Sequence, residues 1–366
     1  MGRTKRAACR WSFAAVALAA TTIVAPLPSV GAKDTRVQVT SIASGLRNPR
    51  GIAWHDRALF VAEAGKGGSG PCAEGQFGEV CFGRSGAITR IRGGNQERIA
   101  RGLPSIASPD GTAAIGPHDV AVDDGKLCVT VGLEGDLQKR RQFGPDARAL
   151  GRLLRIRPNE SRDWVADLAG FEADANPDDG EVDSNPYGVL QRADSTIATD
   201  AGGNSLLRIR NNGRITTLAV FPDRLVPFNG EQVPMDAVPT TVVRGPDGAY
   251  YVGQLTGFPF PVGGARVYRV EPGHKPQVYA RGFTNIIDIA FDPRGRLYVL
   301  EIAHNGLLSE EPYGALQRVN RDGSKKMLLD DGLFFPAGLV VRSAHEMYVT
   351  NCGVCKDTGE VLRVEM

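Results

Sequence analysis

Three features are scarce in this sequence: aromatic residues, which make up 7% of it, long hydrophobic runs, and clusters of like charge. Hydrophobic residues still account for 42% and charged residues for 23%, a balance that excludes a disordered or fibrous protein. Beyond residue 25 no hydrophobic stretch is long enough to span a membrane as a helix. Lysine and arginine are scattered among acidic residues, so we expect no nucleic-acid partner.

Glycine and proline, by contrast, are abundant, with 45 and 23 residues. Both residues favour turns and interrupt helices, so the composition predicts many short elements and few long helices.

The first 32 residues have the pattern of a secretory signal peptide. Four basic residues without an acid precede a hydrophobic stretch at 11–25, and small residues follow at 30–32. A retained membrane anchor is the alternative, but the stretch is shorter than a spanning helix requires. We therefore predict a secreted or extracytoplasmic mature chain of residues 33–366. Removing the four basic residues changes the formal charge of +2 to −2.

The mature chain contains six copies of one pattern, in which short hydrophobic strands alternate with polar turns. The first strand of each copy lies at 49–53, 117–121, 186–190, 239–243, 286–290 and 336–340. Second, third and fourth strands follow, and the third carries an arginine in every copy. The sixth copy ends at Met366 after its third strand, whereas an unassigned strand at 37–42 precedes the first copy.

These observations predict an all-β fold, a six-bladed β-propeller with four-stranded antiparallel blades. The strand at 37–42 would complete the last blade and close the ring, so that residues 33–366 form one domain. Two stacked β-sandwiches are the alternative, but they would give no reason for six copies of one pattern. We expect a monomer.

The lengths of the connections predict which face is functional. Long connections join second to third strands and successive blades, and in a four-stranded meander both kinds emerge on the same face. We call this face, with the entrance to the central channel, the mouth. Long loops on a rigid scaffold are the usual place for binding and catalysis.

Polar residues end five of the six second strands and should reach the mouth. Carboxylates and amides around one axis suit a divalent cation, Ca²⁺ most simply, or a small polar ligand. The metal ligands would be Glu63, Asp200, Glu301 and Asn351. A ligand without metal would contact Glu63, Asp119, Asp183, Asn185, Gln254 and Asn285. The third possibility is that these groups only satisfy strand ends and loop amides.

If the protein is an enzyme, the composition of the mouth favours metal-assisted hydrolysis or isomerisation, with His118 or Asp288 transferring the proton. No Gly-x-Ser-x-Gly nucleophile motif is present. A non-catalytic extracellular binding or accessory protein is the alternative. A protein-interaction surface would instead predict exposed phenylalanines on the mouth.

The stretch from Asp174 to Gly180 resembles the start of an EF-hand calcium loop. Its glycine comes one position late and no closing glutamate follows, so a hydrated turn is the simpler interpretation.

The cysteines also fit an exported protein. Cys72 and Cys81 bracket a glycine-rich insertion and predict a local disulfide. Cys352 and Cys355 predict a second one, with a redox dithiol, a metal site or free thiols as alternatives. Cys128 lies within a strand and should be buried and unpaired.

Several motifs together resemble the ScyD/ScyE family across the whole mature chain. They are Asn48-Pro49-Arg50-Gly51, the insertion 67–81, Gly116-Pro117-His118-Asp119, 183–188, 200–208 and 256–261. The resemblance implies an exported propeller with no settled reaction. The blades also resemble NHL-type repeats and metal-dependent lactonases of the gluconolactonase type, whose central Ca²⁺ or Zn²⁺ the four proposed metal ligands could imitate in position.

Overall fold

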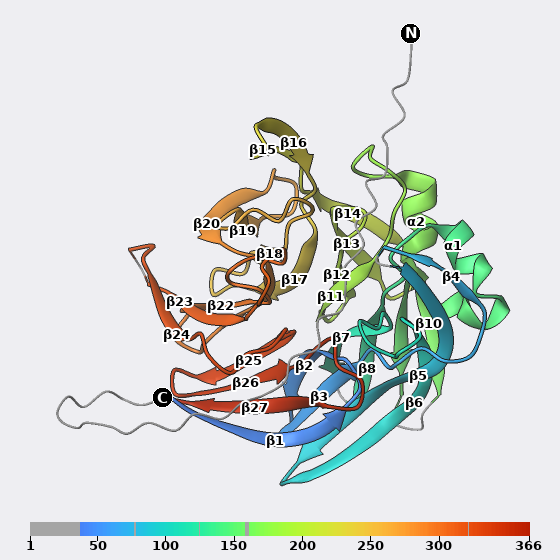
Figure 1. The fold of residues 1–366 in the computed structure, drawn as a ribbon, viewed down its shortest axis with the longest axis horizontal. Helices are drawn as coiled ribbons and strands as arrows, with labels where there is room; N and C mark the ends of the chain where they lie inside the picture. The colour runs from blue at the N-terminus through green and yellow to red at the C-terminus, as the bar shows by residue number, and fades with distance from the viewer. Residues whose placement is uncertain (1–36, 77, 124, 158–160, 321) are drawn as a thin grey trace. The chain divides into compact units, whose positions relative to one another are not determined.

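The computed structural model describes residues 37–76, 78–123, 125–157, 161–320 and 322–366. The predicted signal peptide lies outside the described residues. Residues 37–366 form a ring of six antiparallel four-stranded blades (Figure 1), which confirms the predicted fold. Among the described residues, no helix is long and apolar enough to cross a membrane.

The strands of each blade follow one another outward from the central axis. Blade 1 contains β2 (Pro49–His55), β3 (Ala58–Glu63), β5 (Gly78–Arg92) and β6 (Asn95–Ala107). Blade 2 contains β7 (Pro117–Asp123), β8 (Lys126–Val131), β9 (Arg152–Ile156) and β10 (Arg162–Asp167). Blade 3 contains β11 (Pro186–Gln191), β12 (Ser195–Asp200), β13 (Ser205–Arg210) and β14 (Ile215–Val220).

The second half of the ring repeats this order. Blade 4 contains β17 (Pro239–Arg244), β18 (Tyr250–Gln254), β19 (Ala265–Val270) and β20 (Gln277–Phe283). Blade 5 contains β21 (Ile286–Phe291), β22 (Leu297–Glu301), β23 (Ala315–Val319) and β24 (Lys325–Leu329). Blade 6 contains β25 (Gly338–Ser343), β26 (Glu346–Asn351), β27 (Gly359–Glu365) and β1 (Gln38–Leu46).

The N-terminal strand closes the ring as predicted. β1 pairs antiparallel with β27, from Gln38 opposite Glu365 to Leu46 opposite Gly359, and the two ribbons lie side by side in Figure 1. Strand β1 is longer than the predicted 37–42 because it remains paired up to the start of β2. Its hydrogen bonds cover the edge of β27 that would otherwise be open to aggregation.

The core consists of hydrophobic layers between neighbouring blades. Alternate residues of a strand face opposite neighbours, because the side-chain period of a strand is two. In β3, Leu59 and Val61 pack with residues of blade 6, whereas Phe60 and Ala62 pack with residues of blade 2. The other interfaces are filled in the same way, which explains why most second strands are buried along their whole length.

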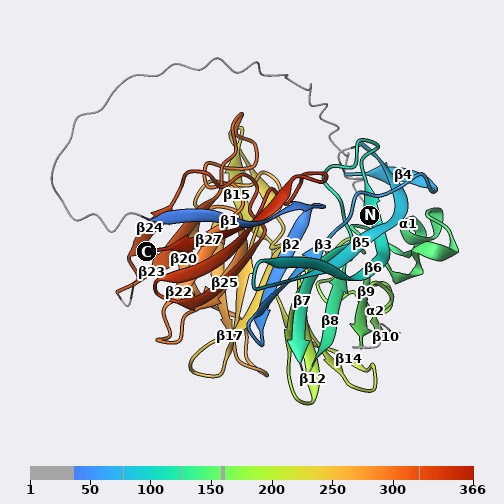
Figure 2. The same ribbon diagram turned by 90° about the horizontal axis from the view of Figure 1, so that it is seen from below.

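All elements outside the blades lie in the connections predicted to cover the mouth. They are β4 (Cys72–Gly75), α1 (Leu137–Gln142), the 3-10 helix η1 (Pro145–Ala149), α2 (Leu168–Ala175), β15 (Arg224–Phe228) and β16 (Glu231–Met235). In Figure 2 the strands are seen from the side, and β4 and β15 lie beyond one end of them. Disulfides join Cys72 to Cys81 and Cys352 to Cys355, and Cys128 is buried and unpaired, as predicted.

Candidate functional site

The polar residues that end four second strands share one local role. Each is buried and accepts a hydrogen bond from a backbone N–H in the segment that leads into the first strand of its own blade. The pairs are Glu63 with Arg47 at 2.8 Å, Asp200 with Asn185 at 2.6 Å, Glu301 with Thr284 at 2.6 Å, and Asn351 with Phe334 at 2.8 Å. These side chains therefore hold the mouth ends of the first two strands of a blade together.

Their remaining hydrogen-bonding capacity is largely used within the same blades. Arg98 binds both oxygens of Glu63, with Nε at 2.9 Å from Oε1 and Nη2 at 2.8 Å from Oε2, and the hydroxyl of Thr89 donates to Oε1. Gln317 donates to Glu301 at 2.7 Å, and His304 also hydrogen-bonds this carboxylate, which raises the pKa of His304.

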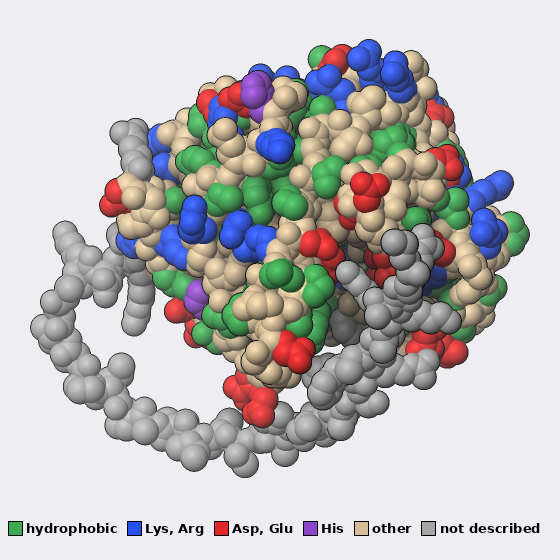
Figure 3. All heavy atoms as spheres, turned by 90° about the horizontal axis from the view of Figure 1, so that it is seen from above, with side chains coloured by type: hydrophobic (Ala, Val, Ile, Leu, Met, Phe, Trp, Pro, Cys, Tyr) green, Lys and Arg blue, Asp and Glu red, His purple; other side chains and the backbone are tan. Residues whose placement is uncertain are grey.

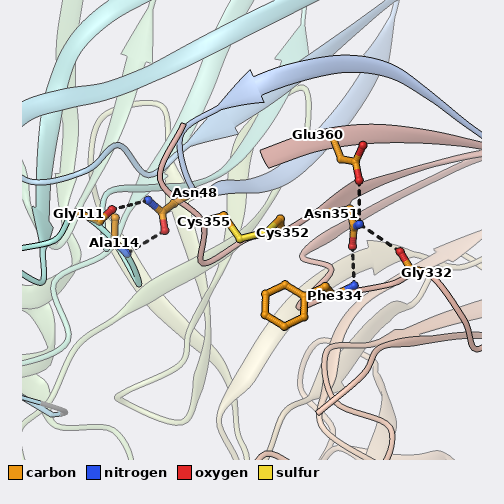
Figure 4. Close-up of a disulfide and its surroundings, with 9 residues drawn as sticks. All are labelled: Asn48, Gly111, Ala114, Gly332, Phe334, Asn351, Cys352, Cys355 and Glu360. Atoms are coloured by element: carbon orange, nitrogen blue, oxygen red, sulfur yellow. Dashed lines mark hydrogen bonds between the residues drawn. A yellow bond between two sulfur atoms is a disulfide. The ribbon is translucent and has the colours of Figure 1, made fainter. Parts of the chain in front are cut away.

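Asn351 lies beside the second disulfide and is satisfied in the same manner (Figure 4). Its amide donates to the carbonyl of Gly332 at 3.2 Å and to Glu360 at 3.1 Å. Across the disulfide in this view, Asn48 donates to the carbonyl of Gly111 at 3.0 Å. The disulfide loop thus lies between two asparagines that hold backbone segments of the mouth.

The four predicted metal ligands do not form one centre in the described part of the chain. Each belongs to a different blade and makes its hydrogen bonds within that blade. In the described ranges, the one group of three His, Cys, Asp or Glu ligand atoms within 4.8 Å of one another is Cys72, Glu79 and Cys81, and two of these are joined as a disulfide. The residues therefore do not fit the central metal of a gluconolactonase-like propeller, and we derive no step through such an ion.

Asp119 and Asp288 occupy equivalent positions in the first strands of blades 2 and 5 and join neighbouring blades. Asp119 accepts from the N–H of Val189 in blade 3 at 2.8 Å. Asp288 accepts from Leu339 in blade 6 at 2.7 Å and from the Thr241 hydroxyl in blade 4 at 2.6 Å. Burial, reinforced by the charge of Asp288, raises the pKa of Asp119. Burial also raises the pKa of Asp288 to about 6.

The predicted amide ligands also anchor the backbone. Asn285 donates to the carbonyl of Leu255 at 3.0 Å and accepts from Leu307 at 3.2 Å, so it ties two mouth loops together. Asn185 accepts from the N–H of Leu133 at 3.3 Å. Gln254 accepts from Arg224 at 3.4 Å, whereas its own Nε2 is buried without a partner. Asp183 has one buried oxygen without a partner.

A different set of side chains meets near the axis at the mouth. Arg50, His118 and Tyr187 follow the first residue of β2, β7 and β11, so they hold the same position in three consecutive blades. The rings of His118 and Tyr187 lie 4.4 Å apart between their centres. All three residues are buried, with 9%, 1% and 9% of their surfaces exposed.

The protonation of His118 follows from its surroundings. Its Nδ1 lies 3.0 Å from the carbonyl oxygen of Pro186, which can only accept, so Nδ1 carries the proton and Nε2 is the acceptor. Burial, together with the charge of Arg50, lowers the pKa of His118 to about 3. At neutral pH this imidazole is therefore a hydrogen-bonding group and a poor proton acceptor.

Of these three residues, Arg50 carries a charge that no salt bridge offsets among the described residues. It donates to the carbonyl of Ala114 at 2.7 Å, but its Nε is buried without a partner. None of the salt bridges found among the described residues involves Arg50. The buried Tyr187 hydroxyl lies close to Arg50 but makes no well-formed hydrogen bond, and burial raises the pKa of this phenol. The charges of Asp119 and Asp288 also act on Tyr187. The site thus presents a cation and unused donors to the axis.

Sequence reasoning selected His118 at this site but not Arg50 or Tyr187. The signal was present, because the six first-strand segments align and place these three residues at one position. The opposite blades contribute Thr240, Ile287 and Ala337 there, so one side of the axis is polar and the other is mostly apolar.

Two larger hollows lie away from the axis. One, of about 650 Å³, separates blades 1 and 2 at the short-turn face and is lined by Arg90, Arg92, Arg98 and Arg157. The other, of about 600 Å³, lies among the mouth loops of blades 5 and 6, next to Tyr313 and Phe334. Acidic, basic and hydrophobic side chains are interspersed on the surface shown in Figure 3.

No family model matches the chain, and no curated protein matches it. A glucose dehydrogenase is 14% identical, with 90% of this chain and 99% of that chain covered at a TM-score of 0.54. A protein of unknown function from Bacteroides thetaiotaomicron is 9% identical, with 90% and 76% covered at 0.56. Virginiamycin B lyase from Staphylococcus aureus, inactivated and with quinupristin, is 12% identical, with 90% and 100% covered at 0.50.

At these identities the likeness shows the fold alone. It supports a β-propeller, and the resemblance to the ScyD/ScyE family remains a prediction.

Proposed function

We propose that this protein is an exported β-propeller that binds a small anionic molecule at the mouth, with Arg50 as the charged contact. The observation that carries the proposal is the burial of Arg50 without a salt bridge in the described part of the chain, where the nearby Glu134 carboxylate acts on it only at a distance. A buried charge is costly unless it is paired, so an anion from solution would supply the missing partner.

Two neighbouring side chains add polarity without adding charge. The Tyr187 hydroxyl lies beside Arg50 without a well-formed hydrogen bond and can donate to an anion. His118 stays neutral and supports the Tyr187 ring by packing against it. The mostly apolar side of the axis, with Ile287 and Ala337, would face the carbon skeleton of such a ligand. A small carboxylate therefore matches the site better than an inorganic anion.

Export is part of the proposal. The predicted signal peptide and the two disulfides support it, because disulfides persist in oxidising compartments. The resemblance to the ScyD/ScyE family, whose members are exported propellers without a settled reaction, is consistent with a binding role.

Titration calorimetry of purified protein with gluconate, citrate and phosphate tests the proposal. We expect binding of at least one carboxylate, and loss of that binding in Arg50→Gln but not in Arg92→Gln, an exposed arginine paired with Asp56 on the short-turn face. Tyr187→Phe removes only a hydroxyl without a well-formed hydrogen bond, so the fold should be unaffected while affinity falls about tenfold, about 1.4 kcal/mol. Unchanged binding in both Arg50→Gln and Tyr187→Phe would refute the site.

A further inference from the structure

A second polar cluster lies beside blade 3, where α2, the segment 176–183 and the turn after β12 come together. Its acidic members are Glu172 on α2, Asp178 and Asp183 in the segment, and Asp200 at the end of β12. The charges of Asp200, Asp178 and Asp183 all act on Glu172, and those of Asp200 and Glu134 act on Asp183. These carboxylates are thus near neighbours although they come from three separate elements.

Three side-chain oxygens in this region are buried and accept no hydrogen bond. They are Oε1 of Glu172, Oδ1 of Asn176 and Oδ1 of Asp183. Glu172 is 1% exposed, so water from outside does not satisfy its carboxylate. Buried polar atoms nearly always have a partner, and three unsatisfied acceptors without an unsatisfied donor among them point to a missing positive group.

The backbone leaves room for the Glu172 carboxylate. A Cβ atom added to Gly203 would lie 2.3 Å from Oε2 of Glu172, and one added to Gly202 would lie 2.8 Å from the carbonyl oxygen of Asp183. The glycines of the turn after β12 therefore allow the two acidic side chains to approach this turn closely. The Glu172 carboxylate thus lies against Gly203, in the turn that follows Asp200, and is shielded from solvent.

No basic side chain neutralises the cluster in the described ranges, where none of the salt bridges includes Glu172, Asp178, Asp183 or Asp200. Lys139 is the cation that acts on Asp183 from α1. Burial, followed by the charge of Asp200, raises the pKa of Glu172 to about 8 and that of Asp183 to about 7. Burial and the neighbouring acids therefore make ionisation of these carboxyls costly, and a bound cation would offset that cost.

We propose that this cluster is a calcium site, with Glu172, Asn176 and Asp183 as direct ligands through their unpartnered oxygens. Asp178 and Asp200 supply further negative charge, and Asp200 is oriented by the Ser184 hydroxyl at 2.6 Å and the Asn185 N–H at 2.6 Å. Hard oxygen ligands in a loop match Ca²⁺, which accepts six to eight of them in irregular geometry, better than Mg²⁺ or Zn²⁺.

Binding requires side-chain rotations that bring the ligand oxygens together. In the part of the chain that the structure describes, no three carboxylate oxygens of this cluster lie within 4.8 Å of one another. Asp178 is only partly buried and accepts from Asn204 at 3.0 Å and from the N–H of Gly180 at 3.0 Å, so it can adjust toward an ion. The stretch that resembles the start of an EF-hand contributes here, but together with α2 and β12 instead of a second EF-hand helix.

The experiment is calorimetric titration of chelator-treated protein with CaCl₂, together with the thermal midpoint with and without calcium. We expect one ion per chain and a higher midpoint with calcium. Glu172→Gln should weaken binding more than tenfold while keeping or raising the calcium-free midpoint, because a neutral amide replaces a buried carboxyl whose ionisation the neighbouring acids disfavour. Asp178→Asn should weaken binding less, and Glu231→Gln, an exposed control on β16, should not change it.

The absence of calcium binding in the wild-type protein would overturn the proposal. So would binding that survives both Glu172→Gln and Asp183→Asn. If Glu301→Gln abolishes binding and Glu172→Gln does not, the ion lies at the predicted mouth carboxylates, and the site proposed here is wrong. A lower calcium-free midpoint in Glu172→Gln would show that this carboxylate is structural, which also contradicts the proposal.

Discussion

The Nδ1 atom of His118 lies 3.0 Å from the carbonyl oxygen of Pro186, so a hydrogen bond joins blade 2 to blade 3 beside the axis. The bond fixes the neutral tautomer, and burial keeps the pKa of His118 at about 3. The imidazole consequently contributes no charge to the mouth at physiological pH.

Binding of gluconate should therefore not depend on titration of His118. We expect His118→Gln to weaken binding by removing the ring that packs against Tyr187, with a ratio of variant to wild-type Kd that stays constant from pH 5.5 to 8. Calorimetry across this range measures the ratio. Glu134, on which the charge of Arg50 acts, can make the absolute affinity depend on pH in both proteins. The ratio of the two Kd values removes that shared dependence and therefore tests His118 alone. A ratio that grows steadily below pH 7 would mean that His118 titrates in the complex.

Asp288 should make the protein less stable as pH rises through the acidic range. Burial raises the pKa of Asp288 from 3.8 to about 6, so between these values the folded protein binds more protons than the unfolded chain. The contribution of Asp288 to the free energy of unfolding should fall by about 2 kcal/mol from pH 4 to pH 6.5. Urea unfolding should show the stability of the wild type falling relative to that of Asp288→Asn over this interval. Asp146→Asn, at an exposed ion pair, is the control, and a wild type that gains stability relative to Asp288→Asn as pH rises would contradict the assignment.

Gly51→Ala should strongly destabilise the ring. A Cβ atom at this position would lie 2.0 Å from Oδ1 and 2.9 Å from the Cα of Asp119, so blades 1 and 2 would have to separate. We expect a loss of about 3 kcal/mol, at the upper end of the usual effect of overpacking. Gly45→Ala, where no atom lies within 4 Å of the added carbon, should show only the smaller effect of a positive φ. Equal losses in the two variants, measured by thermal unfolding, would show that the close approach to Asp119 is not what limits this position.

Glu63→Gln should lower stability without affecting calcium. The carboxylate is fully buried, and Arg98 binds both of its oxygens, so the substitution leaves a partly buried guanidinium without its counter-charge. The expected loss is about 3 kcal/mol. Urea unfolding measures it, and calorimetry with CaCl₂ shows whether metal affinity is retained. If the variant keeps its stability but loses calcium, Glu63 is a metal ligand as the sequence predicted.

The fold was largely predictable because it rests on a repeated pattern. Each blade needs hydrophobic residues at the same buried positions, so six weak copies of one pattern reinforce one another. The second strand of blade 1, for example, packs against both neighbouring blades. One strand is left over before the first repeat and one is missing from the sixth. Both facts are explained by the pairing of β1 with β27.

The hydrogen-bonding partners of the polar side chains were harder to predict. Glu63 and Arg98 are 35 positions apart in the chain, and Asp119 reaches Val189 across a blade boundary 70 positions away. A carboxylate at the end of a strand has the same sequence context whether it binds an ion, an arginine or a backbone N–H. Only the surrounding structure decides: Asp200 and Glu301 accept from a backbone N–H, and Glu63 accepts from both a backbone N–H and Arg98.

Sequence comparison of the blades could have found Arg50 and Tyr187, which share the position of His118. It could not have shown that Arg50 is buried without a salt bridge among the described residues, because that depends on what surrounds it in space.

The pairing of β1 with β27 also determines when the ring can form. Strand β1 precedes every other strand of the ring, yet its partner is β27, so blade 6 stays incomplete until β27 has been synthesised. The strands within each of the other five blades are closer in sequence, so we expect those blades to form first and the pairing of β1 with β27 to be the final, long-range step. Deleting β1 or deleting β27 should accordingly disrupt the same sheet. Deleting both should lower the free energy of unfolding by less than the sum of the two separate losses.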